Sequence, residues 1–390
     1  MKEVGSTPVK SAWISSSRLT LAALLIGAVV ALALLDAYFG GSKTNFEDAA
    51  ALGAETTTVL AKVDGYFIHG SDSRDAESCL SGAHARKAER SVLWLGNSQV
   101  HAINQWRQGE SNGAPILFDD LKRRGLDLLT FSQPNANLQE HYVLFEALRR
   151  QLPLRVLVLP VVFDDLREEG LRNEVAVFAR DEATAATLSR TEIGKRLASA
   201  ARVMPKDTDN ETAGIANTLQ ERAERGLTMW LDKHSQLWQA RPEIRGQLFL
   251  GLYRLRNTLF GIKPSSKRRM IPARYRDNMA ALTAILEAAT QNGIKVVLYV
   301  APLRGGVEIP YDAEEYATFK SEVERLANRP GVSFANLERL VPDELWGVKN
   351  ATALGGEGEL DFMHFKFGGH QLLAKRLEEL VVASLANAKP

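Results

Sequence analysis

Two short segments far apart in the chain carry residue types that together could perform nucleophilic chemistry. Ser98 lies in the first third of the sequence, whereas Asp361 and His364 are three residues apart near the C-terminus. A serine hydroxyl becomes a nucleophile when a histidine takes its proton, and that histidine needs an acceptor on its other nitrogen. An Asp-x-x-His segment can supply both groups, with the carboxylate on Nδ1 and with Nε2 facing the serine. The three residues therefore predict a triad for acyl transfer.

Ser98 lies where a buried strand is expected to turn into a helix. The apolar run 92–95 ends in a Gly-Asn-Ser tripeptide, and a helix is predicted from Gln99 onward. A hydroxyl at such a junction stands at the mouth of the sheet, where backbone N–H groups favour the negative charge of an acyl-transfer intermediate. Gly-Asn-Ser is also ordinary turn chemistry, and Asp-x-x-His is often a helix cap with a surface histidine. The two segments therefore carry weight only in combination.

Five apolar runs predict the strands that position these segments. They are rich in Val and Leu without polar alternation, which is typical of strands covered on both faces. Helical periodicity recurs between them, and this alternation indicates an α/β fold, a three-layer sandwich around a central parallel sheet. The predicted strands are 92–95, 126–131, 155–162, 295–301 and 332–336, and the predicted helices are 139–151, 275–292, 314–328 and 369–388.

Residues 166–274 interrupt this alternation. They contain no convincing strand but have helical stretches at 181–203, 212–239 and 242–260, which predicts a helical insertion within a domain spanning 91–390. An insertion at the carboxyl ends of the strands lies where ligands bind in such sheets. A linker and leading segment, 40–90, precedes the domain; we expect a short helix at 45–62 and mostly loop at 64–90.

The N-terminal segment predicts a membrane anchor. Residues 19–39 are apolar with Asp36 as the only charge, and a helix of this length spans about 30 Å, the thickness of a hydrocarbon core. Basic residues precede the run and acidic ones follow it, which places residues 1–18 in the cytoplasm and everything after about residue 40 outside the membrane. A cleaved signal peptide is the alternative, but the apolar run is long for one and lacks a clean small-residue cleavage site.

Composition excludes several classes of function. The 390 residues carry a formal net charge of +1, which gives no reason to expect nucleic-acid binding. The single cysteine, Cys79, excludes an intramolecular disulfide and a multi-cysteine metal site. The Gly-Gly pairs lack the strand–helix context of a phosphate loop, and a metal site built on Asp361, His364 and Asp164 or Asp165 would have few ligands. We therefore predict no cofactor and no metal.

The order of the two motifs resembles the SGNH/GDSL hydrolase family, in which the serine lies in the first motif and Asp-x-x-His in the last. The resemblance covers about residues 91–385, with the insertion as an interruption. It implies a flavodoxin-like sheet, with Ser98 as nucleophile, His364 as general base and then acid, and Asp361 as the orienting carboxylate.

The residues expected to complete the oxyanion hole depart from the family pattern. The family has a glycine after the second strand and an asparagine after the third, where this chain has Asn135 and Asp164. A carboxylate at Asp164 would repel an oxyanion unless it were protonated or turned away. The candidate oxyanion and substrate residues are Asn97, His101, Asn135, Asn137 and Asp164. The alternative for His101 is a plain helix-surface residue; His141 is expected to cap or pack, and His370 to lie on the exposed side of the last helix.

The predicted anchor narrows the resemblance to the SGNH proteins that accompany membrane-bound O-acyltransferases. These include the D-alanyl transfer protein of teichoic-acid synthesis and the periplasmic proteins of alginate O-acetylation. The resemblance implies a membrane-bound O-acyltransferase partner and a polysaccharide or teichoic-acid-like acceptor that takes the acyl group from Ser98. Two alternatives remain open: an anchored carbohydrate esterase or deacetylase, in which water replaces the acceptor, and a non-catalytic assembly partner.

Overall fold

The computed structural model describes residues 56–204, 251–252, 254–262, 266–349, 351 and 357–386, together with Gly27. The chain divides into two units, one formed by Met1–Ala50 and Asp209–Leu252 and the other by Ala51–Thr208 and Tyr253–Pro390. Nearly all the described residues belong to the second unit, and the fold below is the fold of that unit.

The membrane anchor predicted at residues 19–39 lies outside the described residues, apart from Gly27, which is helical. Within the described ranges, no helix is both long enough and apolar enough to cross a membrane. The anchor, its orientation and the domain limits therefore stay predictions. The helical stretch predicted at 212–239 and most of the stretch at 242–260 also lie outside the described residues, although residues 254–259 are helical.

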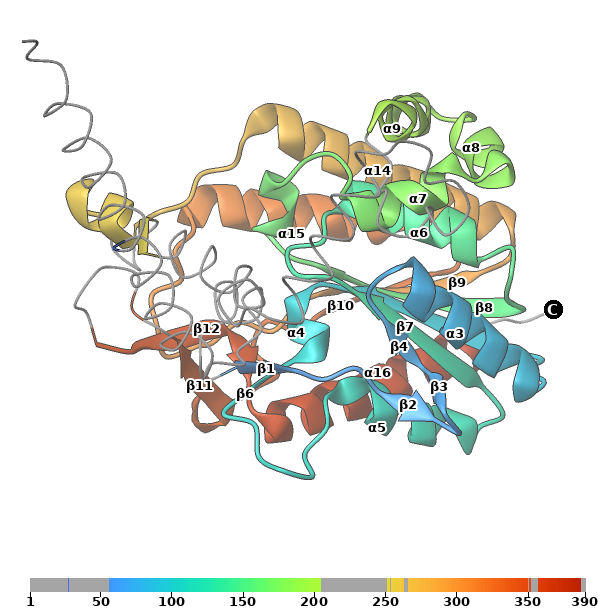
Figure 1. Ribbon diagram of the computed structural model, residues 1–390, viewed down its shortest axis with the longest axis horizontal. Coiled ribbons are helices and arrows are strands. Elements are labelled where there is room, and N and C mark those ends of the chain that lie inside the picture. Colours follow the sequence, from blue (N-terminus) through green and yellow to red (C-terminus); the bar gives the residue numbers. More distant parts are fainter. Residues whose placement is uncertain are drawn as a thin grey trace, which may run out of the picture. The chain divides into compact units, whose positions relative to one another are not determined.

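A six-stranded parallel sheet forms the centre of this unit, in the order β10-β9-β8-β5-β7-β4 (Figure 1). Leaving out the two-residue edge strand β4, the chain order of the neighbours is 2-1-3-4-5, which is the flavodoxin-like order. The predicted α/β fold with a central parallel sheet is thus confirmed, and so are the five predicted strands. The strands are β4 (His69–Gly70), β5 (Ser91–Gly96), β7 (Asp127–Ser132), β8 (Leu154–Val161), β9 (Lys295–Val300) and β10 (Val332–Asn336).

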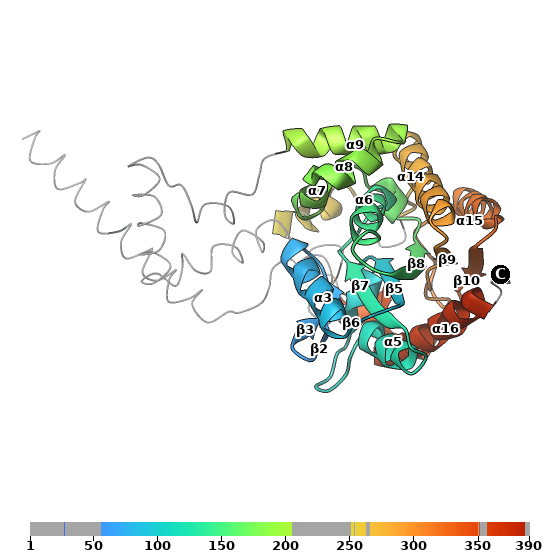
Figure 2. The ribbon, with the colours of Figure 1, turned by 90° about the vertical axis from the view of Figure 1, so that its right-hand side faces the viewer.

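Helices cover both faces of the sheet and make a three-layer sandwich (Figure 2). Helices α3, α6, α14 and α15 pack on one face and α5 and α16 on the other. The four predicted helices are confirmed, with ends shifted by up to three residues. The bounds are α3 (Ser73–Ala85), α5 (Gly113–Lys122), α6 (Leu138–Leu148), α14 (Pro272–Gln291), α15 (Ala313–Ala327) and α16 (Phe367–Ala386).

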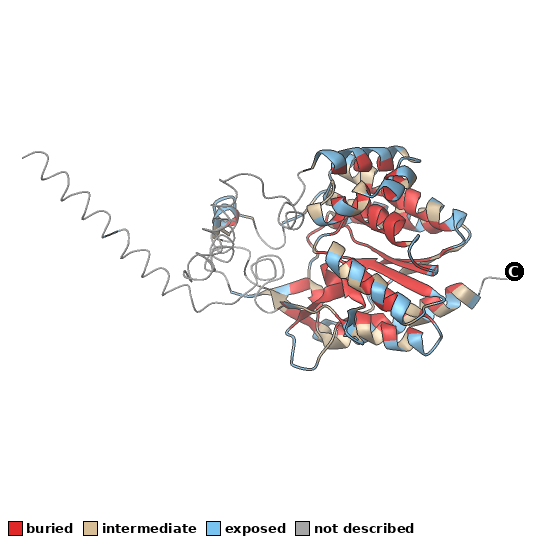
Figure 3. Ribbon diagram, turned by 45° about the vertical axis from the view of Figure 1, so that its right-hand side comes forward, coloured by how far each residue is buried: buried red, intermediate tan, exposed pale blue. Residues whose placement is uncertain are grey.

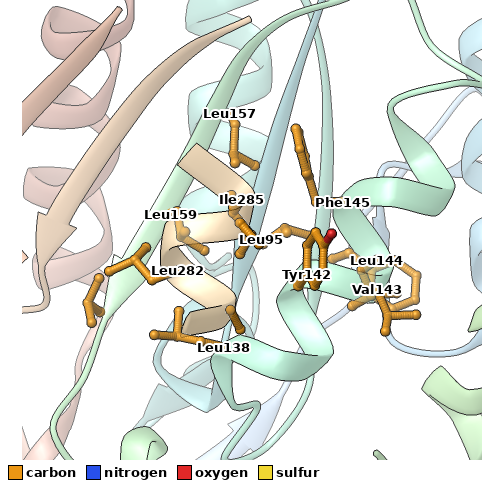
Figure 4. Packing of buried hydrophobic residues seen from close by; sticks show 14 of the residues in the cluster. Leu95, Leu138, Tyr142, Val143, Leu144, Phe145, Leu157, Leu159, Leu282 and Ile285 are labelled. Carbon is orange, nitrogen blue, oxygen red and sulfur yellow. The ribbon is translucent and has the colours of Figure 1, made fainter. Parts of the chain in front are cut away.

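The strands divide their side chains between two cores, as strand geometry requires. Leu93 and Leu95 of β5 face the core under α6 and α14, whereas Val92 and Trp94 face the core under α5 and α16. Figure 3 shows the buried residues along the strands and on the inner sides of the helices, and Figure 4 shows Leu95 among residues of α6 and α14. Each fully buried leucine stabilises the fold by about 1.5–3 kcal/mol, so β5 holds its end, and the turn that follows it, in a fixed place.

Three local predictions were wrong. The segment 64–90, expected as loop, contains α3, which begins after Asp72 because that carboxylate accepts hydrogen bonds from the first backbone N–H groups. The described end of the predicted helix 45–62 instead forms β1 (Thr56–Thr58), which pairs antiparallel with β6 (Ala102–Asn104). The helix predicted from Gln99 onward is only the four-residue α4 (Ser98–His101), because the chain turns at once into β6.

The insertion begins with three helices, α7 (Asn173–Arg180), α8 (Glu182–Leu188) and α9 (Glu192–Val203). They confirm the helical character predicted for 181–203. Their apolar faces join the same core as α6 and α14, so this part of the insertion extends the sandwich and does not stand apart from it.

A β-hairpin carries the C-terminal motif. Its strands are β11 (Trp346–Lys349) and β12 (Glu359–Phe365), which pair antiparallel with a bulge, and α16 follows directly. His370 on α16 is fully buried, so its predicted exposure was wrong. Burial lowers the pKa of His370 to about 3, and the neutral ring accepts from the Gly113 N–H at Nδ1 and donates from Nε2 to the Ala102 carbonyl. The ring thereby ties the last helix to the segments that follow β5.

Candidate active site

The turn after β5 is built by a glycine and an asparagine. A Cβ atom on Gly96 would lie 2.3 Å from Cγ2 of Val100, so only glycine allows the strand to turn this tightly into α4. Asn97 then caps α4, since its side-chain oxygen accepts from the Gln99 N–H at 3.0 Å. Ser98 is the first residue of α4 and stands at the carboxyl end of the sheet.

The structure brings the three predicted triad residues together. Ser98 Oγ lies 2.9 Å from His364 Nε2, and His364 Nδ1 lies 3.0 Å from Asp361 Oδ2. With the ring proton on Nδ1, the histidine donates to Asp361 and its free Nε2 accepts from the Ser98 hydroxyl. The exposed fractions are 6% for Ser98, 9% for His364 and 2% for Asp361, so little water competes for these hydrogen bonds.

Asp361 is held as a carboxylate. Burial by itself would raise its pKa, but the charge and hydrogen bond of His364 and the backbone N–H groups of Met363 and His364 outweigh burial and lower the pKa to about 2. Asn104 of β6 also donates to Oδ2 at 3.2 Å and binds both backbone groups of Val348. Sequence reasoning missed Asn104 because it acts on residues about 250 positions away.

Gln99 ties the turn that carries Ser98 to the hairpin that carries His364. Its side-chain N–H groups donate to the carbonyl oxygens of Pro302 and Met363, both at 2.8 Å. The first carbonyl follows β9 and the second lies next to His364, so one buried amide fixes the serine against two other elements. Nothing in the sequence around Gln99 indicated this role.

Two of the predicted oxyanion residues have structural partners. Asn97 donates from Nδ2 to Asp165 Oδ2 at 2.6 Å while its oxygen caps α4. Asn137 caps α6 in a reciprocal arrangement with Glu140, and its Nδ2 donates to the Gly170 carbonyl. Both side chains therefore hold loops in place, and their predicted role as oxyanion donors gains no support from these contacts.

Asn135 is exposed in the loop between β7 and α6, with a left-handed backbone of φ 51°. It borders a polar cavity of about 350 Å³ at the carboxyl end of the sheet. The cavity is lined by Pro134, Asn135, Asn137, Glu140, Glu168, Glu169, Leu171 and Arg172. The position of this cavity suits a substrate group, and the role of Asn135 toward the oxyanion or substrate stays a prediction.

Asp164 is turned toward cations. Its carboxylate pairs with Arg268 and Arg167 and accepts from the Tyr311 hydroxyl at 3.2 Å. These arginines offset the negative charge through which Asp164 was expected to repel an oxyanion. The carboxyl group that reaches the turn before Ser98 is that of its neighbour, Asp165, which was not among the predicted oxyanion and substrate residues.

His101 belongs to a buried cluster, so the alternative of a helix-surface residue was wrong, and its role toward the oxyanion or substrate stays a prediction. Its Nδ1 lies 2.8 Å from Ser132 Oγ, which lies 2.6 Å from Nε2 of His69. Burial, with the nearby His69 and His364, lowers the pKa of His101 well below its ordinary value, and burial lowers that of His69 to about 3. The cluster is therefore uncharged. His141 is also buried, as the packing alternative expected.

Within the described part of the chain, no group of three or more His, Cys, Asp or Glu side chains is arranged to hold a metal ion.

Comparison with known proteins gives little beyond distant structural matches. No family model matches the sequence, and no curated protein matches it. A "putative acylhydrolase" from Bacteroides fragilis NCTC 9343 is 11% identical over 76% of this chain and 88% of that chain, with a TM-score of 0.33. A GDSL-like lipase from Bacteroides thetaiotaomicron VPI-5482 is 10% identical over 78% and 98%, with a TM-score of 0.34. At these values neither likeness bears on the function of this chain.

The low pKa of Asp361 predicts a pH-dependent contribution to stability. Its pKa falls from an ordinary 3.8 to about 2, so the ionised group contributes about 2 kcal/mol of folding free energy above about pH 4. That contribution is lost as the pH falls through 2, where the carboxyl group is protonated in the folded chain. Urea unfolding of the wild type and Asp361→Asn should therefore show a stability difference that narrows by about 2 kcal/mol between pH ~5 and pH ~2. A difference that stays constant would contradict the charge assigned to Asp361.

Proposed function

We propose that this chain is an SGNH/GDSL-type serine enzyme that moves acyl groups through a Ser98 ester. The observation that supports the proposal is the unbroken hydrogen-bond chain from Ser98 Oγ through the His364 ring to Asp361. Such a chain both activates a hydroxyl and stabilises the imidazolium that forms when the ring takes the proton.

The mechanism follows from this geometry. Ser98 Oγ attacks an ester carbonyl while its proton passes to His364 Nε2, and Asp361 stabilises the positive ring. The ring returns the proton to the leaving alcohol, which departs and leaves the acyl group on Ser98. A second hydroxyl, from water or an acceptor, then attacks the acyl group with His364 again as base and releases the product. The Ser98 N–H, at the start of α4, is one proposed oxyanion donor because the first N–H groups of a helix lack intrahelical partners.

The finer proposal is that the acceptor is a hydroxyl of a surface or exported polysaccharide or teichoic-acid-like polymer. Its support is the predicted membrane segment at 19–39 and the resemblance to anchored SGNH proteins. The enzyme would then be held on the periplasmic side of the inner membrane, beside a membrane-bound O-acyltransferase that supplies the acyl group. The triad serves hydrolysis equally well, so the acceptor distinguishes a transferase from an esterase.

Replacing Ser98 by alanine should abolish labelling by a fluorophosphonate probe and lower hydrolysis of a p-nitrophenyl ester at least about 10³-fold, since the nucleophile is lost. His364→Ala should cause a similar loss. Ser81→Ala is a matched control, because Ser81 is an exposed serine on α3 and takes no part in the hydrogen bonds of Ser98, His364 and Asp361. Equal labelling of the Ser98→Ala and wild-type proteins would overturn the catalytic role of Ser98, and the non-catalytic alternative would then stand.

Adding an acceptor glycan should divert the acyl group from water. With an activated acetyl ester as donor, mass spectrometry should detect acetylated oligosaccharide that depends on Ser98, and donor turnover should rise with the glycan concentration because deacylation is accelerated. Release of acetate alone, at a rate that the glycan does not change, would contradict the transferase proposal and leave an esterase.

A further inference from the structure

Two consecutive aspartates after β8 have opposite surroundings. Asp164 pairs with two arginines and with Tyr311, as described above. Asp165 begins the short helix η1 (Asp165–Arg167) and is 6% exposed, and no lysine or arginine among the described residues lies within ion-pair distance of its carboxyl group. Burying a carboxylate without a cation costs much more free energy than burying the neutral acid.

The polar contact that the structure gives Asp165 is to the Asn97 amide. Nδ2 of Asn97 lies 2.6 Å from Asp165 Oδ2, while Asn97 Oδ1 accepts from the Gln99 N–H. Asn97 follows β5 and Asp165 follows β8, and these neighbouring strands flank the point where the strand order of the sheet reverses, the usual ligand crevice of such folds. The contact therefore joins the two sides of that crevice at the residue that precedes Ser98.

Burial and the neighbouring acidic groups favour the neutral form of Asp165. Burial raises its pKa well above the ordinary value, and the negative charges of Asp164 and Glu168 act in the same direction. The Asn97 hydrogen bond and the positive charge of Arg172 oppose this rise, but Arg172 is bound to Glu140 at 3.0 Å.

We infer that Asp165 is protonated at neutral pH and acts through Asn97 as a positioning residue for Ser98. This inference rests on the proposed function. As a neutral acid, Asp165 fixes the Asn97 amide, and with it the start of α4, without placing a negative charge beside the oxyanion that forms at Ser98. A carboxylate at the same place would hold the turn equally well but would oppose the charge of the transition state.

The pH profile of turnover separates this role from a merely structural one. In the wild type, kcat should fall on the alkaline side as Asp165 ionises, and Asp165→Asn, which keeps the shape and stays neutral, should lack that fall. Asp165→Ala removes the partner of Asn97 and should lower kcat about tenfold or more at all pH values, and Asp165→Asn should restore it to within about threefold of wild type. Loss of activity in Asp165→Asn equal to that in Asp165→Ala would overturn the inference, because an ionised group would then be required.

Infrared spectroscopy tests the protonation state directly. The difference spectrum of wild type minus Asp165→Asn at about pH 7 should contain the C=O band of a protonated carboxyl group, and subtraction removes the signal of other buried acids such as Glu140. A carboxylate band in its place would overturn the inference. This measurement needs neither turnover nor the alanine variant, so it decides the protonation of Asp165 even if Ser98 proves to have no catalytic role.

Discussion

The hydrogen bond between Ser98 and His364 is the contact on which the site depends, and it joins residues 266 positions apart. Ser98 and His364 are each positioned by their own surroundings as well as by this hydrogen bond. Ser98 is fixed by the buried strand β5, by the glycine turn and by the Asn97 cap, and His364 is fixed on strand β12. The Gln99 amide then binds the Met363 carbonyl, so the two elements are joined next to the contact itself. A displacement of about 1 Å at such a contact is enough to lower a rate by two orders of magnitude.

Burial, together with the hydrogen bonds of each group, determines which side chains around this contact are ionised. Asp361 is buried but receives backbone N–H groups and faces the His364 ring, so it stays ionised. His101 and His69 are buried without such compensation, so their pKa values are lowered and their rings are neutral. Burial also disfavours the charged form of Asp165 and raises its pKa well above the ordinary value. Asp361, the carboxylate behind the histidine, therefore keeps its negative charge. That charge favours the imidazolium, which lies beside Asp361, and a protonated Asp165 adds no negative charge next to the turn that carries Ser98.

The sequence predicted what depends on local pattern. Apolar runs predicted the five longer strands of the central sheet, and residue types and order predicted which serine, histidine and aspartate meet. The two-residue strand β4 has no periodicity to detect. His370 was placed on the wrong face because its polar type suggests exposure, although its spacing from Leu373 and Leu377 puts it on the buried side of α16. Asn104, Gln99 and Asp165 act through contacts between distant segments, which no spacing rule reveals.

Trapping the acyl-enzyme tests the central claim most directly. The wild-type protein would be mixed with an activated acetyl ester, quenched in acid within the first turnover, digested and mapped by mass spectrometry. The structure predicts an acetyl group on the hydroxyl of Ser98, and its loss on longer incubation as the ester is cleaved. Acetyl groups that appear on other residues while Ser98 remains free would contradict the account.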